Sequence, residues 1–255
     1  MFLFFFFLIC AMIFVPSLIK RHGEYILPLP GKSKETLNRY FEYYIGLSAQ
    51  NKAIFERRVH RFMRMKEFVP RGVDRVTLEM KTLISACAIQ LTFGYPRVYL
   101  QHFRRILIYE DSYYSDINKQ YHKGEVNPRH GLICLSWKAF VEGYIEKEGI
   151  NLGLHEMAHA LHFENLILND EFDFINPRDL KQWGSLATKE IERIRNGNNT
   201  FLRKYGATNE NEFFAVAVEN FFERPKKFKE DLPEVYRALC KLLRQNPLEL
   251  VAAVP

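Results

Sequence analysis

Cysteine is scarce in this chain of 255 residues, which contains four. Cys10, Cys87, Cys134 and Cys240 are widely scattered, so they form neither a disulfide framework nor a Cys-x-x-Cys metal pair. Proline and glycine are also limited, at 11 and 13, and no internal repeat is visible. Because hydrophobic residues make up 47% of the chain, a disordered, collagen-like or low-complexity protein is excluded.

A strong excess of charge of either sign is missing as well. The formal net charge is +6, which is too small to diagnose an anionic partner. A predicted helix around residues 54–66 carries four interleaved arginines, a pattern shared by nucleic-acid-binding helices and solvated surface helices. We interpret it as a solvated face beside an anionic membrane leaflet, and we expect no nucleic-acid partner.

The first nineteen residues, Met1 to Ile19, contain no charged side chain. A helix of this length spans about 28 Å, close to the hydrocarbon thickness of roughly 30 Å, which predicts a transmembrane anchor. A cleaved secretory signal is the alternative, but no basic start and no clear cleavage site are present. Because Lys20, Arg21 and His22 follow at once, we expect a single-pass membrane protein whose catalytic domain faces the cytoplasm.

The remainder of the chain indicates a linker followed by one domain. Residues 20–32 are the predicted linker and residues 33–255 the domain, with N-terminal helices over 33–74 and a core over 75–255. Short apolar runs bounded by turn residues predict strands at 105–109 and 132–136. Helical spacing recurs at about 33–47, 54–66, 75–91, 137–147, 151–166, 179–195, 209–223 and 231–244. These elements predict an α+β fold, mainly helical, with a small sheet.

One segment, NLGLHEMAHALHFE at residues 151–164, contains an H-E-x-x-H motif in His155, Glu156 and His159. Residues four apart share a helix face, so both imidazoles can bind one ion, and neutral imidazole suits Zn²⁺. Glu156 lies beside the pair, where it can take a proton from a water activated by the metal. The alternative is two incidental histidines on a core-facing helix. The apolar residues around the motif, with Asn151 as a predicted N-cap, favour the metal site.

A catalytic zinc needs a third protein ligand and one open position. Carboxylates are many downstream of the motif, and nine are considered as candidate ligands: Glu164, Asp170, Glu171, Asp173, Glu190, Glu192, Glu212, Glu219 and Glu223. Glu212 has the best surroundings, because it opens the apolar segment NEFFAVAVENFF and a carboxylate there is costly unless it is paired or bound to a metal. However, Asn209 and Glu212 also match a capping box. Local sequence therefore leaves Glu212 open between ligand and helix cap.

Longer segments resemble a known family. HEMAHALH together with YGATNENEFFAVAVENFFERP is similar to the MtfA family of zinc-dependent peptidases, whose catalytic domain resembles that of anthrax lethal factor, and the similarity covers about residues 45–245. The resemblance implies a zincin-like domain. It also implies that His155, His159 and Glu212 bind zinc, that Glu156 is the general base and that Tyr205 supports the oxyanion.

One departure from the family pattern and one expectation about the substrate complete this interpretation. Many members of the family carry an acidic residue where this chain has His162, which we interpret as a packing or surface histidine instead of an extra ligand. An exposed strand edge near Ile133 would pair with the backbone of a peptide substrate, unless that strand is buried in the centre of the sheet.

The sequence thus predicts a membrane-anchored zinc peptidase that acts on a peptide or protein substrate. A zinc-binding regulatory protein is the alternative. It would act by binding a partner protein, such as a transcriptional regulator, with little or no peptidase turnover.

Overall fold

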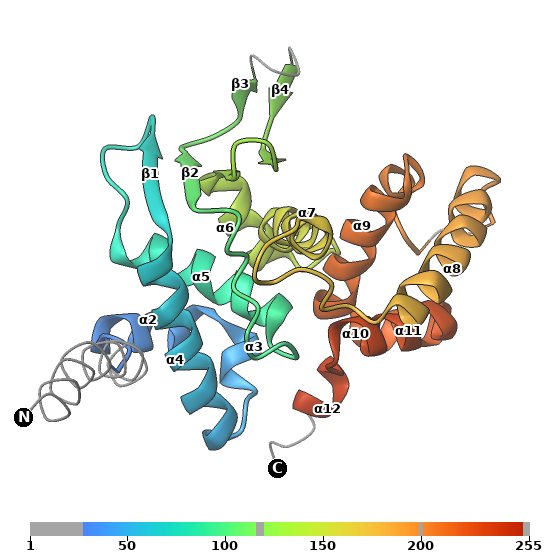
Figure 1. Cartoon of the computed structure of the whole chain (residues 1–255), viewed down its shortest axis with the longest axis horizontal. Helices are drawn as coiled ribbons and strands as arrows, with labels where there is room; N and C mark the ends of the chain where they lie inside the picture. The colour runs from blue at the N-terminus through green and yellow to red at the C-terminus, as the bar shows by residue number, and fades with distance from the viewer. Residues whose placement is uncertain (1–27, 116–119, 199–200, 252–255) are drawn as a thin grey trace, which may run out of the picture.

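The computed structural model describes residues 28–115, 120–198 and 201–251 (Figure 1). Its helices are α2 (Gly31–Tyr40), α3 (Glu42–Ile45), α4 (Ala49–Met65), α5 (Leu78–Thr92), α6 (Trp137–Glu146), α7 (Leu152–Leu166), α8 (Pro177–Arg195), α9 (Glu210–Glu223), α10 (Pro225–Asp231), α11 (Pro233–Leu243) and α12 (Pro247–Val251), with a 3-10 turn η1 (Lys204–Ala207). Its strands are β1 (Glu67–Arg71), β2 (Arg105–Tyr109), β3 (Tyr113–Ser115), β4 (Gln120–His122), β5 (Gly124–Asn127) and β6 (Leu132–Ser136). The predicted α+β fold, mainly helical with a small sheet, is confirmed.

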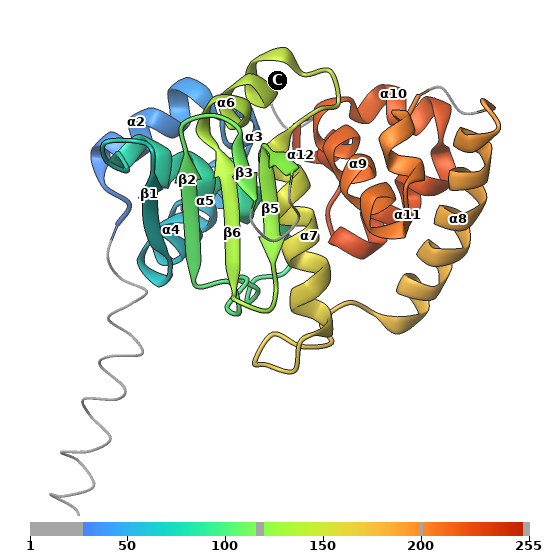
Figure 2. The same cartoon turned by 90° about the horizontal axis from the view of Figure 1, so that it is seen from above.

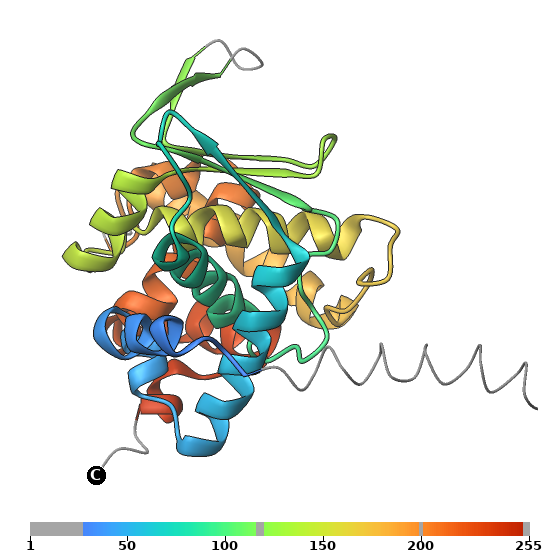
Figure 3. The ribbon, with the colours of Figure 1, turned by 90° about the vertical axis from the view of Figure 1, so that its left-hand side faces the viewer.

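Four strands form the main sheet in the order β1-β2-β6-β5. The first three run parallel, and β5 pairs antiparallel with β6 at the edge. Ile106 and Ile133 are register partners without exposed surface, as expected for a parallel core. Figure 3 shows the helices gathered on one face of this sheet, while the β3–β4 hairpin rises from the other side.

Helix α7, which carries the H-E-x-x-H motif, lies between the sheet and the C-terminal helices. It contacts β5 and β6 on one side and α9 on another, with α5 beside it (Figure 2). As predicted, Asn151 caps its N-terminus, since the Asn151 side chain accepts a hydrogen bond from the Leu154 N–H at 2.9 Å. Ten of its fifteen residues are buried, so this helix is part of the core and its polar side chains are held firmly.

The sheet is larger than the sequence predicts. The two predicted strands, 105–109 and 132–136, coincide with β2 and β6, whereas β1, β5 and the hairpin were not predicted. Pro70 lies within β1, which is tolerated because β1 is an edge strand of the sheet. Strand β5 begins with a glycine and has only four residues, so it offers no clear alternation of apolar side chains. The predicted boundaries of the linker, residues 20–32, and of the domain, residues 33–255, stay predictions.

The prediction of a single-pass membrane protein with its domain facing the cytoplasm is wrong by this structure. Within the ranges that the structure describes, no helix is both long and apolar enough to cross a bilayer. The longest of them, α8, has 19 residues but carries charged side chains along its length, so it is amphipathic and unsuited to hydrocarbon. Residues 1–19, on which the predicted anchor rested, lie outside the described residues.

Candidate metal centre

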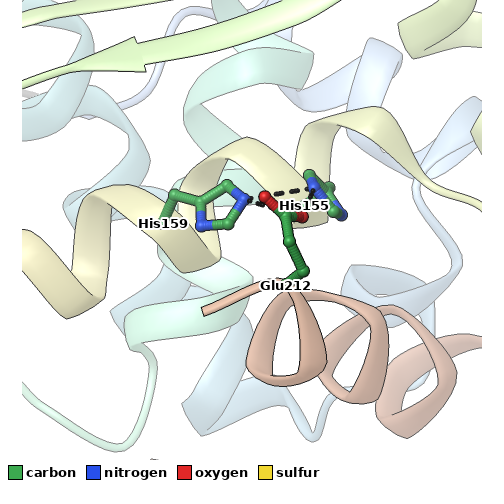
Figure 4. Close-up of side chains that lie close together, drawn as sticks. All are labelled: His155, His159 and Glu212. Carbon is green, nitrogen blue, oxygen red and sulfur yellow. Dashed lines mark hydrogen bonds and ion pairs between the residues drawn. The ribbon is translucent and has the colours of Figure 1, made fainter. Parts of the chain in front are cut away.

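Three of the predicted site residues converge on one point, although they come from helices far apart in the chain. Figure 4 shows His155 and His159 extending from α7 toward Glu212 on α9. The Oε2 atom of Glu212 lies 3.1 Å from Nε2 of His155 and 3.4 Å from Nε2 of His159. The two Nε2 atoms are themselves 3.1 Å apart. Among the described residues, this is the one group of side chains with the composition and spacing to hold a metal ion.

These separations match a tetrahedral ion. Metal–ligand distances of roughly 2.0–2.1 Å place ligand atoms about 3.3–3.4 Å apart. The Oε2 atom of Glu212 is also buried, and it faces the two imidazole nitrogens without forming a hydrogen bond in the part of the chain that the structure describes. A buried carboxylate oxygen without a hydrogen bond is costly, and a cation in contact with it would remove that cost. The donor set therefore fits a divalent metal with nitrogen and oxygen ligands.

The structure shows how Glu212 stands in relation to the two roles that its local sequence left open. The Asn209 side chain accepts a hydrogen bond from the Glu212 N–H at 3.0 Å, so Asn209 caps α9 as the capping box predicts. The Glu212 carboxylate, however, points to the two histidines. The backbone of Glu212 thus belongs to the cap, while its side chain belongs to the cluster.

A buried carboxylate behind the cluster holds His155 in place. Glu219 has no exposed surface, and its Oε1 accepts a hydrogen bond from His155 Nδ1 at 2.6 Å. This bond leaves the opposite nitrogen, Nε2, facing the cluster. The guanidinium of Arg203 donates to both Glu219 oxygens at 2.8 Å, and the Asn151 N–H donates to Oε2 at 2.7 Å.

From the sequence alone, Glu219 is only one of nine candidate ligands, and Arg203 is not among the predicted site residues. A signal for Glu219 was nevertheless present, because it follows Glu212 by seven residues and so lies two turns along the same face of α9. For Arg203 no local pattern was available. It precedes η1 in a segment whose path only the fold determines.

The neighbouring charges alter the pKa values within the cluster. Burial alone would lower the pKa of His155, but the carboxylates of Glu212 and Glu219 beside it raise that pKa to about 10. Burial would raise the pKa of Glu212, but the two imidazoles outweigh it and lower the pKa well below its usual range. A metal ion that binds His155 must therefore displace a proton, so we expect its affinity to fall with falling pH.

Glu156 lies beside the cluster and is nearly inaccessible, with 5% of its surface exposed. Burial raises the pKa of its carboxyl group to about 7, although the charges of His155 and His159 oppose this change. A carboxylate whose pKa is close to neutral is well suited to general-base chemistry near neutral pH.

Tyr205 lies on η1 and belongs to the same site. Its ring centroid is 5.9 Å from that of His155, and about half of the side chain is exposed. Partial burial and the Glu212 carboxylate raise the pKa of its hydroxyl, which stays protonated at neutral pH and can donate a hydrogen bond. By contrast, His162 is not part of the three-residue cluster. Burial lowers the pKa of His162, as for a neutral packing histidine.

An open cleft of about 270 Å³ lies beside the cluster. The three residues of the cluster, Glu156, Tyr205 and residues of strand β5 line it. The proposed ligands, Glu156 and Tyr205 therefore share one solvent-accessible space that a ligand can enter.

The chain is similar to several bacterial proteins over most of its length. It is 29% identical over 238 residues to the uncharacterized protein slr2042 of Synechocystis sp., covering 87% of this chain and 86% of that protein. It is 27% identical over 227 residues to Mlc titration factor A of Escherichia coli, covering 80% and 83%, and 27% identical over 221 residues to Mlc titration factor A of Salmonella arizonae, covering 80% and 87%. Residues 20–244 match the family described as Glucose-regulated metallo-peptidase M90. The chain is a member of this M90 metallopeptidase family, as its resemblance to the MtfA family predicts.

Proposed function

We propose that this protein is a zinc-dependent peptidase with a zincin-like catalytic domain. The observation that carries the proposal is the convergence of two imidazole nitrogens and one carboxylate oxygen within 3.1–3.4 Å of one another, beside an open cleft. Two histidines and one carboxylate are a ligand set typical of catalytic zinc, which keeps a fourth position for water or substrate. Membership of a metallopeptidase family supports the same activity.

In this proposal His155, His159 and Glu212 hold the zinc, and Glu219 fixes the orientation of His155. When bound, zinc polarises a carbonyl group and lowers the pKa of water. Glu156 takes a proton from the attacking water and gives it to the leaving amine. The Tyr205 hydroxyl donates a hydrogen bond to the oxygen of the scissile carbonyl as negative charge develops on it.

We further propose that the substrate backbone pairs with β5. The sequence predicts this role for the strand near Ile133 unless that strand is central; it is β6, which lies between β2 and β5 and has no free edge, so the alternative of a central strand applies. Strand β5 is the sheet edge next to the cleft, and Glu125 and Val126 on it are lining residues. Pairing through backbone hydrogen bonds would align an extended peptide across the metal with little dependence on its sequence.

Cleavage of a mixed peptide library by the zinc-loaded protein, read by mass spectrometry, tests the activity. The matched control is Glu156→Gln, which keeps all three proposed ligands and removes only the base. We expect this variant to bind one zinc per chain and to show no cleavage above background. Equal cleavage by the two proteins would mean that a contaminant or another site is responsible.

A second candidate function is a metal-dependent regulatory protein that acts by binding a partner protein. The name of two relatives, Mlc titration factor A, favours it, because titration implies binding of the protein called Mlc. Absence of cleavage by the zinc-loaded wild-type protein, together with capture of a defined regulator that Glu156→Gln captures equally well, would support this function over the peptidase.

A further inference from the structure

The direction of the Glu156 side chain is not set by hydrogen bonds. Within the described residues, no hydrogen bond or ion pair to its carboxylate occurs, although 95% of the residue is inaccessible to solvent. His155 and His159 act on it only as nearby charges. Packing must therefore determine where this carboxylate points, and the atoms that surround it become important.

Strand β5 provides the wall on one side of Glu156. At its first residue, Gly124, a Cβ atom would lie 2.5 Å from Oε1, 2.7 Å from Cδ and 2.7 Å from Cγ of Glu156. These are the three heavy atoms nearest to that position, and all are much closer than real Cβ contacts. Gly124 and Glu156 thus share a space that holds only one side chain.

A glycine is not required at this position by the backbone. The glycines with positive φ in the described residues are Gly72, Gly131, Gly149 and Gly197, so Gly124 has a backbone conformation that other residues also adopt. The reason for glycine here is therefore space, namely the close approach of an edge strand to another side chain.

We propose that Gly124 is a positioning residue: its lack of a side chain lets β5 lie directly against Glu156 and directs that carboxylate to the metal centre. This inference rests on the proposed peptidase function. The three atoms nearest to a methyl group here all belong to the Glu156 side chain, from Cγ to Oε1, and no backbone atom is among them. Gly124→Ala therefore displaces the carboxylate instead of unfolding the domain.

The matched control for this substitution is Gly184→Ala in α8, where a Cβ would meet no atom within 4 Å. We expect Gly124→Ala to unfold within a few degrees of wild type and to bind one zinc per chain. On a peptide cleaved by the wild-type protein, we expect kcat to fall about 100-fold with little change in KM, because small misplacements of a catalytic group have effects of this size. Gly184→Ala should match wild type in zinc content, kcat and KM, and should unfold at the same or a slightly higher temperature, because alanine is favoured over glycine within a helix.

Inhibitor binding supplies a readout that needs no turnover. A dipeptide hydroxamate chelates the metal and also donates a hydrogen bond to a neighbouring carboxylate, whereas a dipeptide thiol binds the metal alone. We expect Gly124→Ala to bind the hydroxamate about 10-fold more weakly and the thiol equally well, since one hydrogen bond is lost. If the wild-type protein cleaves nothing, the peptidase proposal fails, and this comparison still decides the role of Gly124.

Two outcomes would overturn the inference. One is a Gly124→Ala protein with wild-type kcat and wild-type affinity for the hydroxamate, which would mean that Glu156 keeps its direction despite the methyl group. The other is loss of zinc or of the cooperative unfolding transition in Gly124→Ala, which would make Gly124 a support of the metal ligands or of the fold.

Discussion

The ion pair between the buried Glu219 and the partly exposed Arg203 leads to a prediction about zinc affinity. Replacing Glu219 by glutamine keeps the volume of the side chain but removes its charge. One of the two oxygens becomes an amide group, which replaces either Oε1, the acceptor for the His155 Nδ1–H, or Oε2, the acceptor for Arg203 and the Asn151 N–H. In the first orientation His155 loses the contact that fixes its ring and directs Nε2 to the metal, and in the second it keeps only a neutral amide oxygen as its acceptor.

The expected size of the effect follows from the role of such contacts. Loss of the partner that orients a metal-binding histidine typically weakens metal affinity about 10–100-fold, or roughly 1.4–2.7 kcal/mol. The upper part of this range applies here, because Glu219 has no exposed surface and its bond to His155 is only 2.6 Å long. Water is not available there to replace the lost hydrogen bond.

Competition with a zinc chelator of known affinity measures this effect, with circular dichroism to confirm folding. The matched control is Glu223→Gln, one turn further along α9. Its carboxylate accepts hydrogen bonds from the Gly149 N–H and the Asn151 side chain, and none from His155. We expect Glu219→Gln to bind zinc at least 10-fold more weakly and Glu223→Gln to stay within about threefold of wild type. Unchanged zinc affinity in a folded Glu219→Gln protein would refute this reasoning.

Two further predictions concern the catalytic groups. Burial raises the pKa of Glu156 from 4.5 to about 7, so the folded state keeps a proton that the unfolded state loses, and stability from this group falls as pH rises from about 4.5 to 7. We therefore compare the free energy of urea unfolding of Glu156→Gln with that of wild type, both treated with a chelator, at pH 4.5 and pH 8. The difference should shift in favour of the variant by up to about 3 kcal/mol between pH 4.5 and pH 8. An equal difference at both pH values would contradict the raised pKa of Glu156. Tyr205→Phe should keep its zinc and lower kcat about 10–1,000-fold, since one donor to the oxyanion is lost. A Tyr205→Phe protein with wild-type kcat would remove Tyr205 from the mechanism.

The parts of the fold that the sequence predicts are those with a strong local signal. Helix α7 and the strands β2 and β6 have clear apolar patterns, and Asn151 and Asn209 mark the starts of their helices. Strand β5 has no such pattern, because its place is fixed by pairing with β6 and by contact with α7. Local sequence also placed Ser33 at the start of a helix, whereas it lies inside α2 and contacts Thr82.

In the candidate site, too, the residues with a local sequence signal were predicted and the others were not. The motif spacing identifies His155, Glu156 and His159, because helix geometry alone brings these residues together. Glu212 required the resemblance to a family, since its contact with the histidines spans more than fifty residues of chain. Gly124 and Arg203 were not predicted, because their roles depend on close approaches between elements distant in the sequence.

The zinc content of three variants tests the central claim most directly. Each protein is loaded with zinc, dialysed against a weak chelator and analysed by mass spectrometry for bound metal. Glu210→Ala is the control, because the Glu210 side chain lies outside the cluster and accepts a hydrogen bond from Thr188. The claim predicts one zinc per chain in Glu210→Ala and almost none in His159→Ala or Glu212→Ala. Full zinc content in Glu212→Ala would show that the carboxylate of α9 is not a ligand, and the proposed centre would be wrong.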